Sequence, residues 1–260
     1  MKILLYPDAN HPKWDITKLK HFFAKAKIEI ASSINENFDA AIYWSYHKTK
    51  REHDTTIKEL NDRCGVINFG CDDISKSKVE RIMFSTFGYN TIINPETSSF
   101  FGEKSELQGR HSIVEKTKFE GYKENCIYVK ILDGRINPTT TRDFRIYVFG
   151  SKISLVVTKD KPIEQKYMGA AVAELKAYKN PQELFSEKEI ENILDFCTFY
   201  GVQITELDAM RDSDGRLYII DNNNVSAFAD KEKELLFANN GYLLNYLSKE
   251  LKKFLKKWTL

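Results

Sequence analysis

Acidic and amide side chains gather around one predicted hairpin in the last quarter of this 260-residue chain. Asp208 ends the first predicted strand. Asp221 and Asn223 lie two residues apart on the second strand, so their side chains leave the same face. A turn at residues 212–215 brings the strands together. Two carboxylates and an amide oxygen are ligands that suit Mg²⁺, which usually combines one or two carboxylates with phosphate oxygens. This spacing therefore predicts a magnesium site.

The alternative interpretation is a polar hairpin whose acidic residues face water. Two features disfavour it. Ile219 and Ile220 make the second strand resemble a core strand, and the three consecutive asparagines at 222–224 are unusual at a plain strand end.

The elements that must position these residues form two blocks. In the first block, apolar runs alternate with helical patterns, which is typical of a parallel α/β unit. From residue 111 the pattern is β-rich, with Gly-containing turns between the runs. A helix begins near residue 73, and residues 96–111 are interpreted as a polar connection. The predicted strands are 2–6, 28–31, 38–44, 66–69, 112–117, 126–132, 143–148, 152–157, 203–207 and 217–221, and further helices are 16–27, 55–63, 186–200 and 242–258.

The last predicted helix, residues 242–258, is amphipathic, with leucines and aromatics on one side and five lysines on the other. Two interpretations stay open. The helix docks its apolar stripe on the body of the protein, or it lies on an anionic membrane surface. We favour the docked helix, because terminal helices usually need such contacts to be ordered.

The segment 206–224, ELDAMRDSDGRLYIIDNNN, resembles the metal-binding signature of the ATP-grasp superfamily. In that signature an acidic residue is followed on the next strand by Glu/Asp-x-Asn, and Asp208, Asp221 and Asn223 match it. The resemblance implies a mixed α/β (α+β) protein with the ATP-grasp fold. It implies an N-terminal α/β unit over residues 1–90, a small lid over 91–135, and a C-terminal subdomain over 136–260.

Other segments resemble ATP-grasp motifs in the same order. The helix from residue 75 resembles the one that carries a phosphate-binding lysine, with Lys78 as the match and Lys76 as a close alternative. The segment 112–121 resembles the strand with the second phosphate-binding lysine, Lys116. This lysine lies in an otherwise apolar run, where a charge is costly without a partner.

The segment 126–133 resembles the hinge strand that pairs with adenine, through the backbone of Val129, Lys130 and Ile131. ATP-grasp proteins commonly have Glu at the position of Lys130. The segment 141–150 resembles the next strand, with Asp143 near the ribose and Arg145 near the phosphates. The planar guanidinium of arginine suits phosphate recognition.

The resemblance implies an ADP-forming ligase that uses ATP and Mg²⁺, or Mn²⁺, to join a small-molecule carboxylate to an amine or a thiol through an acylphosphate. Arg145 and Arg211 are the candidates that stabilise negative charge, and Arg211 could instead pair with Asp212. The closest likeness is to small bacterial proteins of surface-glycan or secondary-metabolite pathways. Two alternatives stay open: a phosphotransferase acting on a hydroxyl or amide, and a nucleotide-binding protein without turnover.

The composition of the chain argues against several other kinds of protein and site. The net charge of +2 gives no general attraction to nucleic acid. The four cysteines form no C-x-x-C pair, so we expect neither a zinc site nor a disulfide framework. No run approaches the ~20 apolar residues of a membrane span. We therefore expect a cytoplasmic protein without nucleic-acid or membrane-spanning partners.

Overall fold

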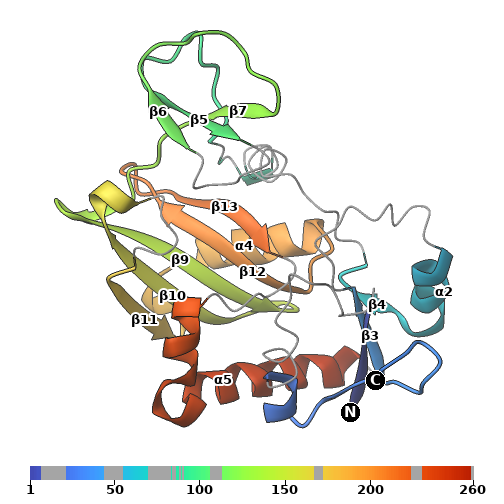
Figure 1. The fold of residues 1–260 in the computed structure, drawn as a ribbon. Coiled ribbons are helices and arrows are strands. Elements are labelled where there is room, and N and C mark those ends of the chain that lie inside the picture. Colours follow the sequence, from blue (N-terminus) through green and yellow to red (C-terminus); the bar gives the residue numbers. More distant parts are fainter. Residues whose placement is uncertain are drawn as a thin grey trace.

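The computed structural model describes residues 1–6, 22–43, 55–69, 83, 86–87, 89, 91–105, 113–166, 172–223 and 230–258, with no side chains described for 230–240. The strands form three sheets, which Figure 1 shows as three separate regions of the molecule. The predicted helix that carries Lys76 and Lys78 lies outside the described residues, except for part of its C-terminal end.

The first sheet is parallel, and its strand order is β2-β1-β3-β4. Its core strands carry the predicted apolar runs, and Ile3, Leu5 and Ile42 are buried. The predicted parallel α/β unit is therefore confirmed in the described residues. The elements are β1 (Lys2–Tyr6), β2 (Glu29–Ile30), β3 (Ala40–Tyr43), α2 (Thr55–Cys64) and β4 (Val66–Ile67).

The second sheet is small and antiparallel, with β5 (Phe101–Ser105) between β6 (Val114–Lys116) and β7 (Cys126–Val129). The prediction of a polar connection over 96–111 is therefore wrong for residues 101–105. Gly102 lies in the middle of β5, and a Cβ there would come within 2.7 Å of Ile131 Cδ1. Glycine at this position allows the strands to pack closely, although its presence makes the segment look like a loop.

The third sheet is the largest and provides the central platform of the molecule. Its order is β11-β10-β9-β12-β13, and β8 pairs with β9. All of its described strand pairs are antiparallel. The strands are β8 (Arg135–Asn137), β9 (Thr140–Phe149), β10 (Lys152–Pro162), β11 (Glu174–Tyr178), β12 (Ile204–Arg211) and β13 (Leu217–Asn223).

Two helices cover opposite faces of the central sheet (Figure 1). α4 (Glu187–Phe199) begins with a capping box at Ser186 and packs Ile193 and Phe196 against one face. α5 (Asp230–Trp258) packs its apolar side into a core shared by the other face and the N-terminal sheet. The buried leucines of α5 are Leu244, Leu247, Leu251 and Leu255. These contacts support the docked interpretation of the C-terminal helix. No helix within the described ranges is long and apolar enough to cross a membrane.

Asn68 connects the N-terminal unit to β12. Its side chain is fully buried, and its Oδ1 accepts hydrogen bonds from the N–H groups of Gln203 (2.8 Å) and Ile204 (2.9 Å). Its Nδ2 donates to the carbonyl of Ile204 at 2.9 Å. The backbone of Asn68 is left-handed, with φ of 62°, which asparagine tolerates better than most residues. The start of β12 is therefore fixed before the strand reaches its charged residues.

Candidate active site

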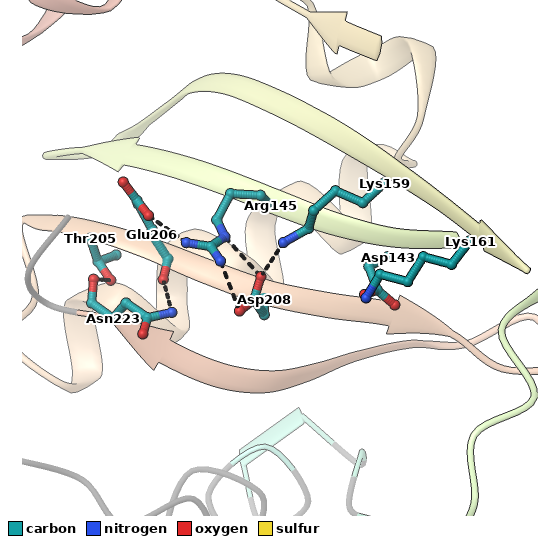
Figure 2. Close-up of polar contacts among 8 residues, drawn as sticks. All are labelled: Asp143, Arg145, Lys159, Lys161, Thr205, Glu206, Asp208 and Asn223. Carbon is teal, nitrogen blue, oxygen red and sulfur yellow. Dashed lines mark hydrogen bonds and ion pairs between the residues drawn. The ribbon is translucent and has the colours of Figure 1, made fainter. Parts of the chain in front are cut away.

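One end of the central sheet carries a row of charged side chains on a single face (Figure 2). Strand alternation explains the row. On β9, Phe144, Ile146 and Val148 pack under α4, so the residues between them face the other way. Asp143 and Arg145 therefore share the face that Tyr147 and Phe149 occupy farther along β9. The neighbouring strands contribute Lys159, Lys161, Glu206 and Asp208 to the same row.

Arg145 is the centre of this row. Its Nε donates to Asp208 Oδ1 at 2.8 Å and its Nη2 to Asp208 Oδ2 at 3.3 Å. Its Nη1 donates to Glu206 Oε2 at 2.5 Å. Glu206 is only 1% exposed, and the side chains of Arg145 and Asp208 are each 12% exposed. Burying charges is costly unless each has a partner, so these contacts hold the three groups in one arrangement.

Two lysines of β10 complete the row. Lys159 Nζ lies 3.1 Å from Asp208 Oδ1, and Lys161 Nζ lies 2.5 Å from Asp143 Oδ2. Sequence reasoning missed both lysines, together with Glu206. The available signal is the alternation in Thr158-Lys-Asp-Lys, which places two charges on one face at the end of a strand that is otherwise apolar. Their partners lie 49 and 18 residues away in sequence, which local patterns do not reveal.

β13 carries Asp221 and Asn223, which lie beside the charged row. Asp221 is paired with Asp208, and Asn223 is paired with Glu206. The register shifts between Asp208 and Ala209, which leaves Ile220 as an extra residue in β13. Because of this bulge, Tyr218 and Ile220 pack with Met210 on the site face, and Asp221 still faces Asp208 across the ladder. The structure therefore places the three residues predicted to bind magnesium at neighbouring positions of one β-ladder.

The end of β13 is held by a second set of contacts. Asn223 Nδ2 donates to the carbonyl of Glu206 at 3.3 Å. Thr205 Oγ1 lies 3.0 Å from the carbonyl oxygen of Asn223 and 2.6 Å from Asn222 Oδ1 (Figure 2 shows Thr205 and Asn223). The run of asparagines thus ties the strand end to β12. Within the described residues, no group of three or more His, Cys, Asp or Glu side chains is arranged to hold a metal ion by itself.

The hinge between the small sheet and the central sheet lies beside this site. The backbone of Val129 and Lys130 pairs with residues 91–92. The Lys130 ammonium contacts the Asp212 carboxylate and lies 5.4 Å from the centre of the Tyr218 ring. Burial lowers the pKa of Lys130, but the hydrogen bond and charge of Asp212 outweigh burial and raise that pKa above its ordinary value.

Asp212 shows the complementary effect. Burial raises the pKa of its carboxyl, but the Asp133 N–H, which donates to Oδ1 at 2.8 Å, and the Lys130 ammonium outweigh burial. The pKa of Asp212 is therefore below its ordinary value. Lys130, which departs from the glutamate of the ATP-grasp pattern, is thus bound to the turn of the β12–β13 hairpin. An apolar cluster lies next to this pair, formed by Leu132, Met210, Tyr218 and Ile220.

Two predicted residues lie away from the charged row. Lys116 is on β6 of the small sheet, where its side chain is 31% exposed and its Nζ lies 3.9 Å from Glu120 Oε2. The expectation of an apolar strand around Lys116 is wrong, because Val114 is 52% exposed and β6 is an edge strand.

Arg211 faces α4, on the opposite side of the sheet from Arg145. It contacts the Glu189 carboxylate, and it donates to the carbonyls of Gly215 at 2.7 Å and Leu184 at 3.2 Å. Burial raises the pKa of Glu189, but the bonds from Arg211 and Ser186 outweigh burial and lower it. Arg211 therefore joins the hairpin turn to the start of α4. It points neither into the charged row nor toward Asp212.

No protein-family model matches this sequence, and no curated protein matches it. Solved structures match nearly the whole chain. The ATP-grasp ligase PsnB, solved with a minimal precursor, matches with a TM-score of 0.62 at 12% identity, over 97% of this chain and 98% of that chain. PsnB solved with a phosphomimetic precursor variant, Mg and ADP matches with a TM-score of 0.58 at 12% identity, over 100% and 98%.

Two further solved structures also match nearly the whole chain. The RiPP-associated ATP-grasp ligase of Chryseobacterium gregarium, solved with ADP and a leader and core peptide, matches with a TM-score of 0.52 at 14% identity, over 97% of this chain and 96% of that chain. D-cycloserine synthetase DcsG matches with a TM-score of 0.51 at 12% identity, over 98% and 100%. The order of the elements and the three sheets are consistent with these structural matches. The chain therefore has the ATP-grasp fold, as the sequence resemblance predicts.

Proposed function

We propose that this protein is an ATP- and Mg²⁺-dependent ligase that activates a carboxylate as an acylphosphate and joins it to an amine or thiol. The observation that carries the proposal is the pairing of Asp208 with Asp221, next to Asn223 and Arg145, on the central sheet of an ATP-grasp fold. Structures with this fold hold Mg and ADP in PsnB and ADP in the C. gregarium ligase.

The chemistry of the donors fits magnesium. Asp208, Asp221 and Asn223 would hold the ion through two carboxylates and one amide oxygen, and phosphate oxygens would fill the remaining positions. Magnesium bound there would neutralise negative charge on the transferred phosphoryl group. Asp208 already has cationic partners in Arg145 and Lys159, so binding the ion requires its oxygens to be shared or these contacts to be rearranged.

The nucleotide would lie between the small sheet and the central sheet. The apolar cluster of Leu132, Met210, Tyr218 and Ile220 provides a surface for the base beside the hinge at Val129, Lys130 and Ile131. Asp143 would lie near the ribose. Lys116, with Lys78 or Lys76, would contact the phosphates from the lid side, and Lys159 would add a cation from the sheet side.

Arg145 has the role of positioning and charge stabilisation in this proposal. Its guanidinium contacts Glu206 as well as Asp208, and Glu206, which is not a proposed metal ligand, keeps it in place when negative charge develops. Catalysis by positioning and charge neutralisation needs no nucleophilic side chain. Arg211 is left out of the proposed set, because its hydrogen bonds are to α4 and to the turn.

The matched structures suggest the class of molecule that bears the carboxylate. PsnB and the C. gregarium ligase are solved with peptides, and DcsG is a D-cycloserine synthetase. We therefore propose that the carboxylate belongs to a peptide or to a small amino-acid-like molecule.

The test is ADP release with Mg²⁺, ATP, a candidate acid and a candidate amine, present together and separately. Release that needs both substrates supports ligation, and trapping by hydroxylamine reveals the acylphosphate. Release with a hydroxyl acceptor alone identifies a kinase, and binding without release identifies a protein without turnover. Asp221→Ala should lower turnover by about 100-fold or more, as for loss of a transition-state charge partner. Asp195→Ala, an exposed aspartate of α4, is the matched control.

A further inference from the structure

The cavity between α5 and the β9–β10 hairpin is separate from the site described above. It has a volume of about 390 Å³ and is lined by both elements. Along β9 the cavity residue Phe149 lies four positions beyond Arg145, about 13 Å at the usual strand rise. A volume of this size is within the range of small-molecule sites, about 300–1,000 Å³.

The walls of the cavity are aromatic and fixed. Phe149 is buried at the end of β9, and Phe254 of α5 packs over the turn at Gly150. A Cβ at Gly150 would lie 2.7 Å from Phe254 Cδ2, and the backbone there is left-handed with φ of 61°. Only glycine fits this turn without displacing the ring. The hairpin and the helix therefore line a half-open space that has two aromatic side chains in its wall.

The rim of the cavity is basic. Lys152 from the hairpin and Lys253, Lys256 and Lys257 from α5 line it, and Glu250 is the one acidic residue among its lining residues, which gives a net charge of +3. Glu250 is nearly buried and contacts Lys152 and Lys253, the latter at 2.6 Å. Burial raises the pKa of Glu250, but these two lysines outweigh burial and lower it. The carboxylate thus holds two ammonium groups at the cavity and leaves an excess of positive charge there.

Ser154 provides an independent observation. It lines the cavity and is 1% exposed, and its Oγ has no hydrogen-bond partner among the described residues. It lies where the β9–β10 register shifts between Ile153 and Leu155, so it is the extra residue of a bulge. Buried hydroxyls almost always have a partner, and one without a partner is costly. A solvated lysine face on a docked helix explains the lysines but does not explain this hydroxyl.

We infer that this cavity binds a phosphate monoester with an apolar body, at a second site of the protein. A net charge of +3 matches a phosphate monoester, which carries about −1.5 to −2 at neutral pH. Lysine ammonium groups bind phosphate as mobile point charges at the rim. The apolar body enters between the two phenylalanine rings, and the buried Ser154 hydroxyl turns into the cavity to meet a polar atom of the ligand.

The experiment is an NMR titration of the full-length protein with phenyl phosphate, followed at the backbone amides. The expected result is saturable shifts at Ser154, Phe149 and Lys257. Inorganic phosphate lacks the apolar body and benzyl alcohol lacks the charge, so each should bind at least about tenfold more weakly, a difference of ~1.4 kcal/mol. Shifts that do not saturate, or equal binding of either comparator, overturn the inference.

Variants distinguish binding in the cavity from nonspecific attraction to the lysines of α5. Lys256→Gln combined with Lys257→Gln changes two exposed side chains and should weaken phenyl phosphate binding about tenfold. Lys249→Gln, an exposed lysine of α5 that does not line the cavity, should leave it unchanged. Ser154→Ala should keep the melting temperature and weaken binding. If Ser154→Ala unfolds, the lysine pair decides alone, and equal loss of binding in Lys249→Gln refutes the site.

Discussion

The charged side chains of the central sheet and Lys116, on the edge strand β6 of the small sheet, lie in different surroundings. On the central sheet, Asp143 and Glu206 are each 1% exposed and have cationic partners. On the small sheet, Lys116 is partly exposed and its acidic neighbour is 3.9 Å away. Buried charges must be paired, so their geometry is fixed, whereas exposed pairs contribute little and stay adaptable. The central sheet therefore holds a fixed charge arrangement, whereas Lys116, on the edge strand of the small sheet, stays adaptable.

The comparison is tested most strongly at Arg145. Replacing Arg145 by Met leaves Glu206 and Asp208 buried with fewer partners, so the free energy of unfolding should fall by about 3–5 kcal/mol. Urea unfolding followed by circular dichroism measures this. Arg135, whose side chain is 52% exposed and paired with Asp133, is the matched control, and Arg135→Met should stay close to wild type. Equal losses in both variants would contradict the distinction between buried and exposed pairs.

The second test removes the partner of Asp143. Lys161→Met leaves that carboxylate buried without its ammonium group, and the expected loss is about 2–3 kcal/mol. Lys188→Met provides the exposed comparison, since this lysine is 71% exposed on α4. Thermal unfolding of both variants under identical conditions is the measurement. A Lys161→Met protein as stable as wild type would show that Asp143 is satisfied by other groups.

The third test examines the contact between the small sheet and the central sheet that is made by the ion pair of Lys130 with Asp212. The pKa of Asp212 is lowered in the folded protein from its ordinary value of 3.8. A lowered folded-state pKa contributes stability above the unfolded-state pKa, and this contribution is lost as the pH falls through the folded-state value. The stability difference between wild type and Asp212→Asn should therefore be full at pH 6 and shrink below pH ~4. Urea unfolding from pH 2.5 to 7 measures it, and a constant difference would contradict the assignment.

The smallest effect on stability is expected at Lys116. Lys116→Met should change the free energy of unfolding by less than about 0.5 kcal/mol, because its ion pair is long and partly exposed. Under the proposed function it should weaken ATP binding, by about tenfold for a lost phosphate contact. Calorimetric titration with ATP and Mg²⁺ measures the affinity. Unchanged affinity would remove Lys116 from the nucleotide site while leaving the comparison of stabilities intact.

The sequence predicts elements well where apolar runs are long. The strands of the parallel unit, the apolar stretches 143–148 of β9 and 152–157 of β10, and the docked stripe of α5 follow from local patterns, whereas the charged end of β10 at 158–162 does not. β5 does not, because Gly102, Glu103 and Lys104 resemble a loop until two other strands enclose them. Tertiary packing overrides local preference there.

The site was predictable only in part, because it too depends on tertiary contacts that local patterns do not reveal. Asp208, Asp221 and Asn223 lie on one hairpin, so their spacing is visible in the sequence. Lys159 and Lys161 depend on the pairing of β10 with β9, and β9 must also pair with β12. Arg211 directly follows Met210, whose side chain is on the site face. Strand alternation therefore places the Arg211 side chain on the opposite face, against α4. A motif identifies residue types at their positions, whereas long-range strand pairing decides which of them meet.

The extra residue Ile220 in β13 has a consequence for insertion tolerance. A residue added within the turn at 212–215 lengthens a loop at little cost and keeps Asp221 opposite Asp208. A residue added between Ile220 and Asp221 would instead turn Asp221 and Asn223 toward α4. The segment between the two acids is thus permissive in its turn and restrictive in its strand residues. Length variants that keep both acids in place should therefore be confined to the turn.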